Sequence, residues 1–273
     1  HNYLKDKAHG LRRKIFNTAM DAGKGHIPGA FSWVEIGVAL YYGGIVNFKP
    51  DQPKWSERDI VVLSKGHSCL TLYSILSDLG YFPNDELFKY GKGGGMLAGH
   101  PDIEIPGIET CTGSLGHGLG VACGMSLSSK LNDSKRKHFV ILGDAECHEG
   151  SVWEAAMFAG HQKLGNLVAI IDRNGFGATD ATENYGSIEP IEQRFQAFGW
   201  ETIRLNGHEF DELLPTLQSA KERKISMPPL CIIAETIKGK GISFMQNSRD
   251  WHHQMPKGEQ IDTAWLELGG KLD

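Results

Sequence analysis

The stretch HFVILGDAECHEGSVWEAAMFAGHQKLGNLVAIIDRNGF, residues 138–176, decides the fold. It holds two apolar runs, at 139–142 and 167–171, and each run stops at turn residues. Short apolar runs of this kind are typical of buried strands. Between them, Ser151 and Glu154 have the spacing of a capping box, and small apolar residues then recur at helical spacing. The stretch therefore predicts a β-α-β unit.

Two polar side chains follow the predicted strands, Asp144 after the first and Asn174 after the second. A helical crossover makes the strands parallel, so both residues lie at the carboxyl edge, where open α/β sheets bind ligands. A carboxylate, an amide oxygen and a nearby backbone carbonyl form an incomplete oxygen set that suits Mg²⁺ completed by phosphate and water. Gly143 lets the backbone approach phosphates closely. Either turn alone is commonly ordinary, but the pair at this spacing predicts a phosphate–metal site.

The chain has 273 residues, of which 40% are hydrophobic, so it is long enough for one large α/β domain over residues 1–273. The net charge of −5 and the lack of a Lys/Arg run argue against nucleic-acid and membrane-surface partners. No apolar stretch is long enough to span a bilayer, and the first residues contain no signal-peptide core. We therefore expect a cytoplasmic protein.

Five cysteines form an odd, scattered set without a Cys-x-x-Cys pair, which disfavours a disulfide framework and a zinc site. Cys147 is close to Asp144 in the sequence, a position that a catalytic nucleophile would also occupy. We interpret it as a small, partly buried thiol, because no activating base is fixed beside it in the sequence.

The remaining patterns predict a mostly parallel sheet with helices on both faces, an α/β fold. Further strands are expected at 59–64, 201–205 and 230–237, and helices at about 11–22, 34–40, 70–79, 119–129 and 211–221. The Gly/Pro-rich stretch 23–29 is expected to be irregular. The glycine-rich stretch 91–96 lacks Walker spacing and follows no strand, so we interpret it as a flexible connection.

Several loops add candidate ligand contacts. His67 follows a predicted strand and is expected at the same edge as Asp144, while His26 lies in the loop 23–29, as a ligand contact or an ordinary loop residue. The stretch 112–118 opens a helix whose amino terminus suits an anion or a flat ring, or allows tight helix packing. The adjacent His252 and His253 are interpreted as a loop pair, since consecutive residues rarely converge on one metal.

Six motifs, taken in order, resemble the amino-terminal, diphosphate-binding half of a transketolase, and above all the split, two-subunit forms. Each is weak alone, but the ordered series covers nearly the whole chain. The motifs are Lys24-Gly25-His26-Ile27-Pro28-Gly29, Leu63-Ser64-Lys65-Gly66-His67, Gly99-His100-Pro101, Thr112-Gly113-Ser114-Leu115-Gly116, Gly143-Asp144 with Asn174, and Lys238-Gly239-Lys240-Gly241 with Trp251-His252.

This resemblance implies a thiamine-diphosphate site with Mg²⁺, for which Ca²⁺ or Mn²⁺ can substitute. The implied metal ligands are Asp144, Asn174 and the carbonyl of Phe176. The implied cofactor-binding residues are His67, Gly113, Ser114, Leu115, Gly143, Asp144, Ala145, Asn174, Lys238 and His252. The sequence departs from the family in having Ala145 as the third residue of the Gly-Asp-Gly fingerprint, no second Asn beside Asn174, and Ser114 where Pro is frequent.

The same resemblance implies three catalytic histidines. His26 and His100 match residues that hydrogen-bond the sugar, with His100 facing the C1 hydroxyl of the donor, and His252 matches a residue near cofactor and substrate. His253 stands where the family usually has Gly and His117 where it has Gln, which leaves acceptor specificity open.

The implied reaction transfers a two-carbon ketol unit from a ketose or ketose phosphate to an aldose acceptor. The nearest enzymatic alternative resembles deoxyxylulose-phosphate synthase or another thiamine-diphosphate enzyme that forms acyloins, and it shares the Lys-Gly-Lys-Gly motif. The stretches 64–67 and 99–101 favour transketolase. The alternative of another class is a non-catalytic subunit that holds the cofactor pocket.

The resemblance also implies a partner. In the family, the Glu that activates the aminopyrimidine of the cofactor lies in the next module, and no acidic residue here matches it. We expect a separate C-terminal subunit with the pyrimidine-binding and C-terminal domains, in an α2β2 assembly that uses sugar phosphates. Glu149 matches a family Glu near the subunit interface.

Overall fold

Five parallel strands form the centre of the protein in a computed structural model that describes residues 1–271. The order across the sheet is β1-β2-β3-β5-β4, and every neighbouring pair is parallel. The strands are β1 (Ile60–Leu63), β2 (His138–Gly143), β3 (Leu167–Arg173), β4 (Glu201–Asn206) and β5 (Leu230–Glu235). The predicted β-α-β unit and α/β class are confirmed.

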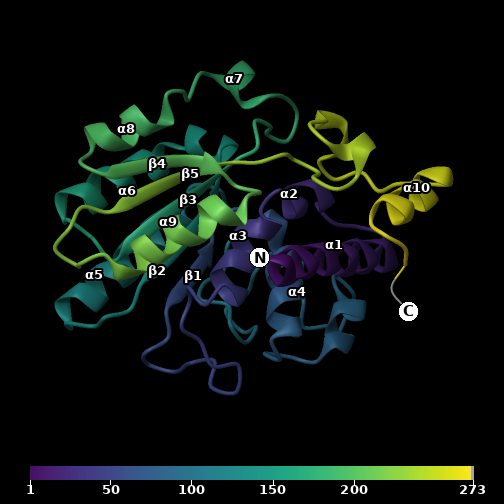
Figure 1. Cartoon of the computed structure of the whole chain (residues 1–273), viewed down its shortest axis with the longest axis horizontal. Coiled ribbons are helices and arrows are strands. Elements are labelled where there is room, and N and C mark those ends of the chain that lie inside the picture. Colours follow the sequence, from purple (N-terminus) through teal and green to yellow (C-terminus); the bar gives the residue numbers. More distant parts are fainter. Residues whose placement is uncertain (272–273) are drawn as a thin grey trace.

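Helices cover both faces of this sheet (Figure 1). One face carries α1 (Asn2–Ala22), α3 (Val34–Tyr42), α4 (Cys69–Asp78) and α9 (Phe210–Glu222), and the other carries α5 (Gly118–Leu131), α6 (Gly150–His161) and α8 (Ile191–Ala197). Successive strand residues point to opposite faces, so Phe139 and Ile141 of β2 join the first core while Val140 and Leu142 join the second. Burial on both faces explains why these strands are continuous apolar runs.

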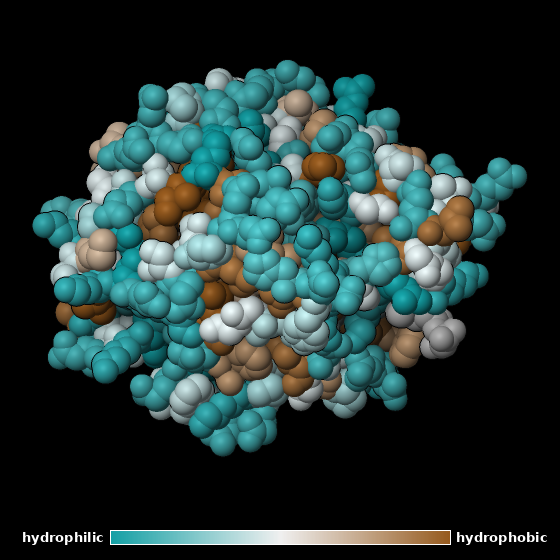
Figure 2. Space-filling model, viewed as in Figure 1, coloured by the Kyte–Doolittle hydropathy of each residue, from teal (hydrophilic) through white to brown (hydrophobic). Residues whose placement is uncertain are grey.

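Short elements complete the fold. They are α2 (Ile27–Phe31), α7 (Thr182–Tyr185), α10 (Glu259–Glu267) and the 3₁₀ turns η1 (Gly66–Ser68), η2 (Asn84–Lys89), η3 (Ala145–His148), η4 (Ser243–Met245) and η5 (Arg249–Trp251). Trp265 of α10 packs edge-on against Phe16 of α1, with 4.9 Å between ring centroids. Hydrophilic residues cover most of the face seen in Figure 2, with apolar residues in separate patches. Within residues 1–271, no helix combines the length and the apolar content that crossing a membrane requires.

Several local expectations differ from the structure, and the first is that α1 begins at Asn2, well before the expected start near residue 11. The stretch 23–29 is not irregular throughout, because α2 begins at Ile27 and Pro28 suits the first turn of a helix. The capping box is absent: Ser151 donates instead to the carbonyl of Gly116 at 3.0 Å. Strand β5 ends at Glu235, two residues earlier than expected.

Strand β3 lies at the centre of the sheet, which sets up a matched pair of substitutions. Ile170 in β3 is fully buried, whereas Ile203 in the edge strand β4 is 38% exposed. Ile170→Ala and Ile203→Ala remove the same atoms, but only the first leaves a buried cavity. We expect Ile170→Ala to lower the free energy of unfolding by about 2–5 kcal/mol. Ile203→Ala should lower it by less than about 1 kcal/mol. Urea unfolding followed by circular dichroism measures both, and equal losses would contradict this account of the core.

Candidate active site

A cavity of about 230 Å³ lies at the carboxyl edge of the sheet. Its walls come from the segments that follow β1, β2, β3 and β5, together with α2 and the loop before α5. The lining residues are Gly29, Lys65, His67, Gly113, Leu115, Gly143, Asp144, Ala145, Glu146, Asn174, Phe176, Gly177, Ala178, Lys238 and His252. A larger hollow of about 1180 Å³ lies elsewhere, beside Trp55 and His138, and holds none of these side chains. The smaller cavity is therefore the candidate site.

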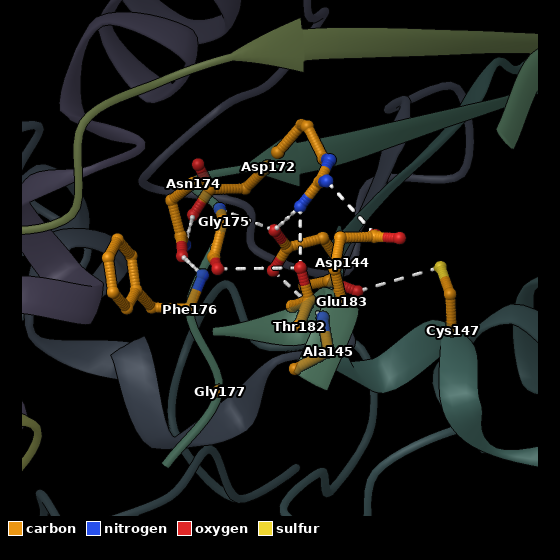
Figure 3. Close-up of polar contacts among 12 residues, drawn as sticks. Asp144, Ala145, Cys147, Asp172, Asn174, Gly175, Phe176, Gly177, Thr182 and Glu183 are labelled. Carbon is orange, nitrogen blue, oxygen red and sulfur yellow. Dashed lines mark hydrogen bonds and ion pairs between the residues drawn. The ribbon is translucent and has the colours of Figure 1, made fainter. Parts of the chain in front are cut away.

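Asp144 lies just after β2 and is 1% exposed. Its Oδ1 accepts from the N–H of Ala145 at 2.8 Å, while Oδ2 accepts from the N–H of Gly175 at 2.6 Å and from Nη1 of Arg173 at 2.9 Å. Figure 3 shows this carboxylate beside Gly175 in the turn after β3. Burial raises the pKa of Asp144, and Arg173 acts in the opposite direction.

Asn174 has a fixed amide orientation. Its Nδ2 donates to Oδ2 of Asp172 at 3.1 Å, and its Oδ1 accepts from the N–H of Phe176 at 3.1 Å (Figure 3). Asp144, Asn174 and Phe176, the residues predicted to supply oxygen donors, all line the one cavity. Residues 1–271 contain no group of three or more His, Cys, Asp or Glu placed to hold a metal. A metal here would depend on this mixed oxygen set and on oxygens of a ligand.

Lys65 and Asp172 form a buried ion pair that was not predicted. The side chains are 2% and 0% exposed, and Nζ of Lys65 binds Oδ2 of Asp172 and also the carbonyl of Gly29 at 3.1 Å. Asp172 accepts in addition from the hydroxyls of Ser32 and Thr236. Burial acts to raise the pKa of Asp172, but Lys65 and these hydroxyls outweigh it, so the pKa is lowered. The pair ties the ends of β1 and β3 together.

Glu146 is a second buried carboxyl that the sequence did not single out. It accepts from the N–H of Gly116 at 2.8 Å, from the N–H of Gly143 at 3.1 Å, and from the hydroxyl of Ser64. Burial raises its pKa. Glu146 thereby joins the segments after β1 and β2 to the loop before α5. The only available signal was its position two residues after Asp144, which by itself does not reveal these partners.

Lys238 follows β5 and is 2% exposed. Its Nζ donates to the carbonyl of Gly177 at 2.6 Å and to Nδ1 of His252 at 3.1 Å. Because an ammonium group only donates, His252 accepts through Nδ1 and carries its hydrogen on Nε2. Burial lowers the pKa of Lys238 to about 8, and burial together with Lys238 lowers the pKa of His252 to about 3. At neutral pH the lysine is charged and the imidazole is neutral.

Three of the predicted histidines form a cluster. The ring centroids of His26, His67 and His252 lie 5.1 to 5.5 Å apart. Burial, reinforced by His100, lowers the pKa of His26 to about 4, and burial beside Lys65 lowers the pKa of His67 well below its usual value. All three rings are therefore neutral hydrogen-bonding groups at neutral pH.

Three predicted site residues lie outside the cavity walls: His26, His100 and Ser114. His26 contacts the lining through the histidine cluster. His100 is exposed, and its ring lies against Gly113, where a Cβ would approach it to 2.8 Å. Gly113 also has a φ of +147°, so both the space and the backbone favour glycine there.

Cys147 is not among the residues that line the cavity. It is 1% exposed, and burial raises the pKa of its thiol well above its usual value. This environment agrees with the interpretation of Cys147 as an inert thiol.

Comparison with known proteins places this site in a family. The family described as the thiamine-diphosphate-binding domain of transketolase matches residues 5–271. One subunit of an apulose-4-phosphate transketolase from Phocaeicola vulgatus is 39% identical over 96% of this chain and 92% of its own length. One subunit of a 6-deoxy-6-sulfo-D-fructose transketolase from a Clostridium species is 36% identical over 97% of this chain and 96% of its own length.

Single-chain transketolases match over part of their length. The mouse enzyme is 39% identical over 94% of this chain, which spans 41% of the mouse protein. The crystal structure of Campylobacter jejuni transketolase superposes with a TM-score of 0.92 at 30% identity, over 99% of this chain and 43% of that one. The chain therefore belongs to the transketolase family, as a thiamine-diphosphate-binding domain of the length found in the relatives that are separate subunits.

Proposed function

We propose that this chain is the N-terminal subunit of a two-subunit, Mg²⁺-dependent transketolase. The reaction would move a two-carbon ketol unit from a ketose phosphate donor to an aldose acceptor. The observation that carries this proposal is the cavity lined by Asp144, Asn174 and Phe176, together with the cation Lys238 and with His67 and His252 of the histidine cluster. The relatives of similar length support it, since they are named as transketolase subunits.

The donor set fits a hard metal ion bridging to a diphosphate. Asp144, Asn174 and the carbonyl of Phe176 would hold Mg²⁺, with Ca²⁺ or Mn²⁺ as substitutes. Among the described residues 1–271, Oδ1 of Asp144 accepts one hydrogen bond and so keeps a lone pair for a metal. Lys238 and His67 would meet the diphosphate, while Gly113 and Leu115 would lie against the aminopyrimidine ring. Ala145 fills the place of the third fingerprint glycine in the same wall.

When bound, thiamine diphosphate supplies the nucleophilic carbon and the electron sink for cleaving the ketose. The chain supplies orientation and hydrogen bonds. His252 presents Nε2–H as a donor because Lys238 occupies its Nδ1. His26, beside it, is kept neutral and able to accept a proton from a sugar hydroxyl.

The partner in this proposal is a C-terminal subunit that carries the pyrimidine-binding module, in an α2β2 assembly in the cytoplasm. Apolar side chains lie exposed on the two helices at one face of the molecule, Val121 and Leu131 on α5 and Met157 and Phe158 on α6, with exposures from 38% to 75%. Exposed apolar groups on adjacent helices are typical of a protein interface. Symmetric closure favours two copies of each subunit.

The substrates proposed here are sugars that carry an anionic group, because relatives are named for a sugar phosphate and a sulfo sugar. His117 and His253 differ from the usual family residues, and both are exposed, so this proposal has them influence acceptor choice. A deoxyxylulose-phosphate-synthase-like reaction and a non-catalytic cofactor-holding role remain the competing proposals, and the assays below separate them.

Asp144→Ala tests the metal site. We expect this variant to lose Mg²⁺-dependent binding of thiamine diphosphate by more than the roughly 10–100-fold that loss of an outer-shell partner costs, because it removes the only carboxylate of the donor set. Calorimetry measures the affinity, and circular dichroism checks the fold. Asp6→Ala, an exposed aspartate on α1, is the control. Unchanged affinity in Asp144→Ala would refute the assignment.

His100→Ala separates substrate binding from cofactor binding. His100 lies outside the cavity walls, so we expect cofactor affinity in His100→Ala to stay within about twofold. Turnover of the ketose donor should fall roughly tenfold, because one hydrogen bond to the substrate is lost. The exposed His161 on α6 provides the control His161→Ala. If cofactor affinity collapsed while donor kinetics at saturating cofactor stayed normal, the roles of the histidines would be misassigned.

A reconstitution assay tests the split-enzyme proposal. The purified chain alone should show at least about 100-fold less ketol transfer than the chain with its partner subunit, because the activating Glu is expected from that partner. Omitting the acceptor aldose, or offering pyruvate as donor, distinguishes transketolase from the synthase-like alternative. Full turnover by the chain alone would overturn the proposed division of labour, and no turnover with the partner would favour the non-catalytic role.

A further inference from the structure

Arg173 is the last residue of β3, and its side chain is 13% exposed. Within residues 1–271 its guanidinium group donates to side chains of four residues, of which Figure 3 labels Asp144, Thr182 and Glu183. Nη1 donates to Oδ2 of Asp144 at 2.9 Å and to the hydroxyl of Thr182 at 2.7 Å, Nη2 donates to Glu183 at 3.2 Å, and Nε donates to Glu189 at 2.9 Å. Neither the motifs nor the spacing of the sequence pointed to this residue.

Strand geometry explains why Arg173 reaches Asp144. Side chains alternate between the two faces of a sheet, so Asp172 and Arg173 point in opposite directions. Asp172 turns toward Ser32 and Lys65, on the face covered by α3, while Arg173 turns toward Glu183 and Glu189. Two adjacent residues of one strand thus hold the two proposed side-chain metal ligands separately. Asp172 accepts a hydrogen bond from Asn174, and Arg173 donates one to Asp144.

The two oxygens of Asp144 have different surroundings. Oδ2 accepts from both Arg173 and Gly175, whereas within residues 1–271 Oδ1 accepts only from Ala145. A carboxylate oxygen has two lone-pair positions, so Oδ2 is saturated and Oδ1 has one left. We propose that Arg173 is a positioning residue for the metal site: it holds Oδ2 of Asp144 and so directs Oδ1 toward the metal. This inference rests on the proposed function.

The same guanidinium group also anchors the segment after β3. That segment supplies the carbonyl of Phe176, and Arg173 ties it down through Glu183 and Glu189. Glu189 in turn forms an ion pair with Arg204 of β4 at 3.0 Å. The ion pairs Arg173–Glu189 and Glu189–Arg204 thus connect this segment to the sheet. The carboxylate ligand and the loop that carries the carbonyl ligand are therefore oriented by one group before any metal arrives.

Preorganisation of this kind distinguishes between metals. Mg²⁺ requires near-ideal octahedral geometry, whereas Ca²⁺ accepts flexible coordination with more ligands. Loss of Arg173 leaves the carboxylate held by the N–H groups of Ala145 and Gly175 but removes the one side-chain donor that helps to orient it. We therefore expect the affinity for Mg²⁺ to fall more than the affinity for Ca²⁺, a change in selectivity that general loss of stability does not produce.

The experiment titrates Mg²⁺ and, separately, Ca²⁺ into the metal-depleted full chain in saturating thiamine diphosphate, with calorimetry as the readout. We expect Arg173→Gln to raise the Kd for Mg²⁺ by about 10–100-fold, the usual effect of losing an outer-shell partner, and the Kd for Ca²⁺ by less than half that factor. Arg173→Lys keeps a charge without the planar fork and should fall between wild type and Arg173→Gln. Thermal unfolding of the metal-free variants checks that they fold.

Two further variants sharpen the test. Arg194→Gln removes an arginine that donates to the carbonyl of Ser187 in the same segment but does not contact Asp144, and it should change neither affinity. Glu189→Gln weakens one anchor of Arg173 and should shift Mg²⁺ binding in the same direction by a smaller factor, which keeps the proposal testable if Arg173→Gln fails to fold.

Equal losses for both metals, unchanged Mg²⁺ affinity in the Arg173 variants, or the same loss in Arg194→Gln would overturn the proposal. A wild-type chain that takes up neither metal with thiamine diphosphate present would refute the metal site itself, and with it this inference. The wild-type titration therefore distinguishes failure of the proposed function from failure of the role given to Arg173.

Discussion

The buried ion pair of Lys65 and Asp172 is the interaction on which the rest of the site depends. Removing both charges from water is costly, and the pair persists because each charge is matched and hydrogen-bonded. Breaking such a pair typically costs about 3–5 kcal/mol, because the remaining charge is left buried and unpaired. Asp172 also accepts hydrogen bonds from the hydroxyl of Thr236, just after β5, and from the side-chain amide of Asn174. One carboxylate therefore sets the relative positions of three strand ends and the orientation of a proposed metal ligand.

The electrostatics of the cavity follow from burial combined with a few cations. Lys238 and His252 lie in one wall of the cavity, with His26 beside His252, and burial keeps the positive charge on the lysine while His26 and His252 stay uncharged. A diphosphate would add negative charge beside this lysine and would stabilise its protonated form. The imidazoles remain free to exchange protons with a substrate, which a permanently charged ring could not do. Separating the charged group from the proton-transfer groups is thus a property of the architecture.

Local sequence patterns predicted the sheet and half of the site. The apolar runs, and the rule that parallel strands end at one edge, were sufficient to place Asp144 and Asn174 together, and the structure has both in one cavity. The supporting residues were not predictable in this way. Lys65 and Asp172 are 107 positions apart, and Glu146 finds its partners in three different segments, so each depends on tertiary packing that no window of sequence contains. Arg173 follows the apolar run 167–171, and the sequence pattern assigned it to the turn that ends the strand.

The order of strands in the sheet has a consequence for synthesis of the chain. Strand β4 is made before β5, yet its only sheet partner among the described residues is β5, which inserts between it and β3. Until residue 235 has left the ribosome, one edge of β3 lacks its native neighbour and β4 has none. Unpaired strand edges are sites of aggregation, and parallel pairing between distant segments is slow. The nascent chain is thus most vulnerable in the interval between β4 and β5, and protection by a chaperone would matter most there.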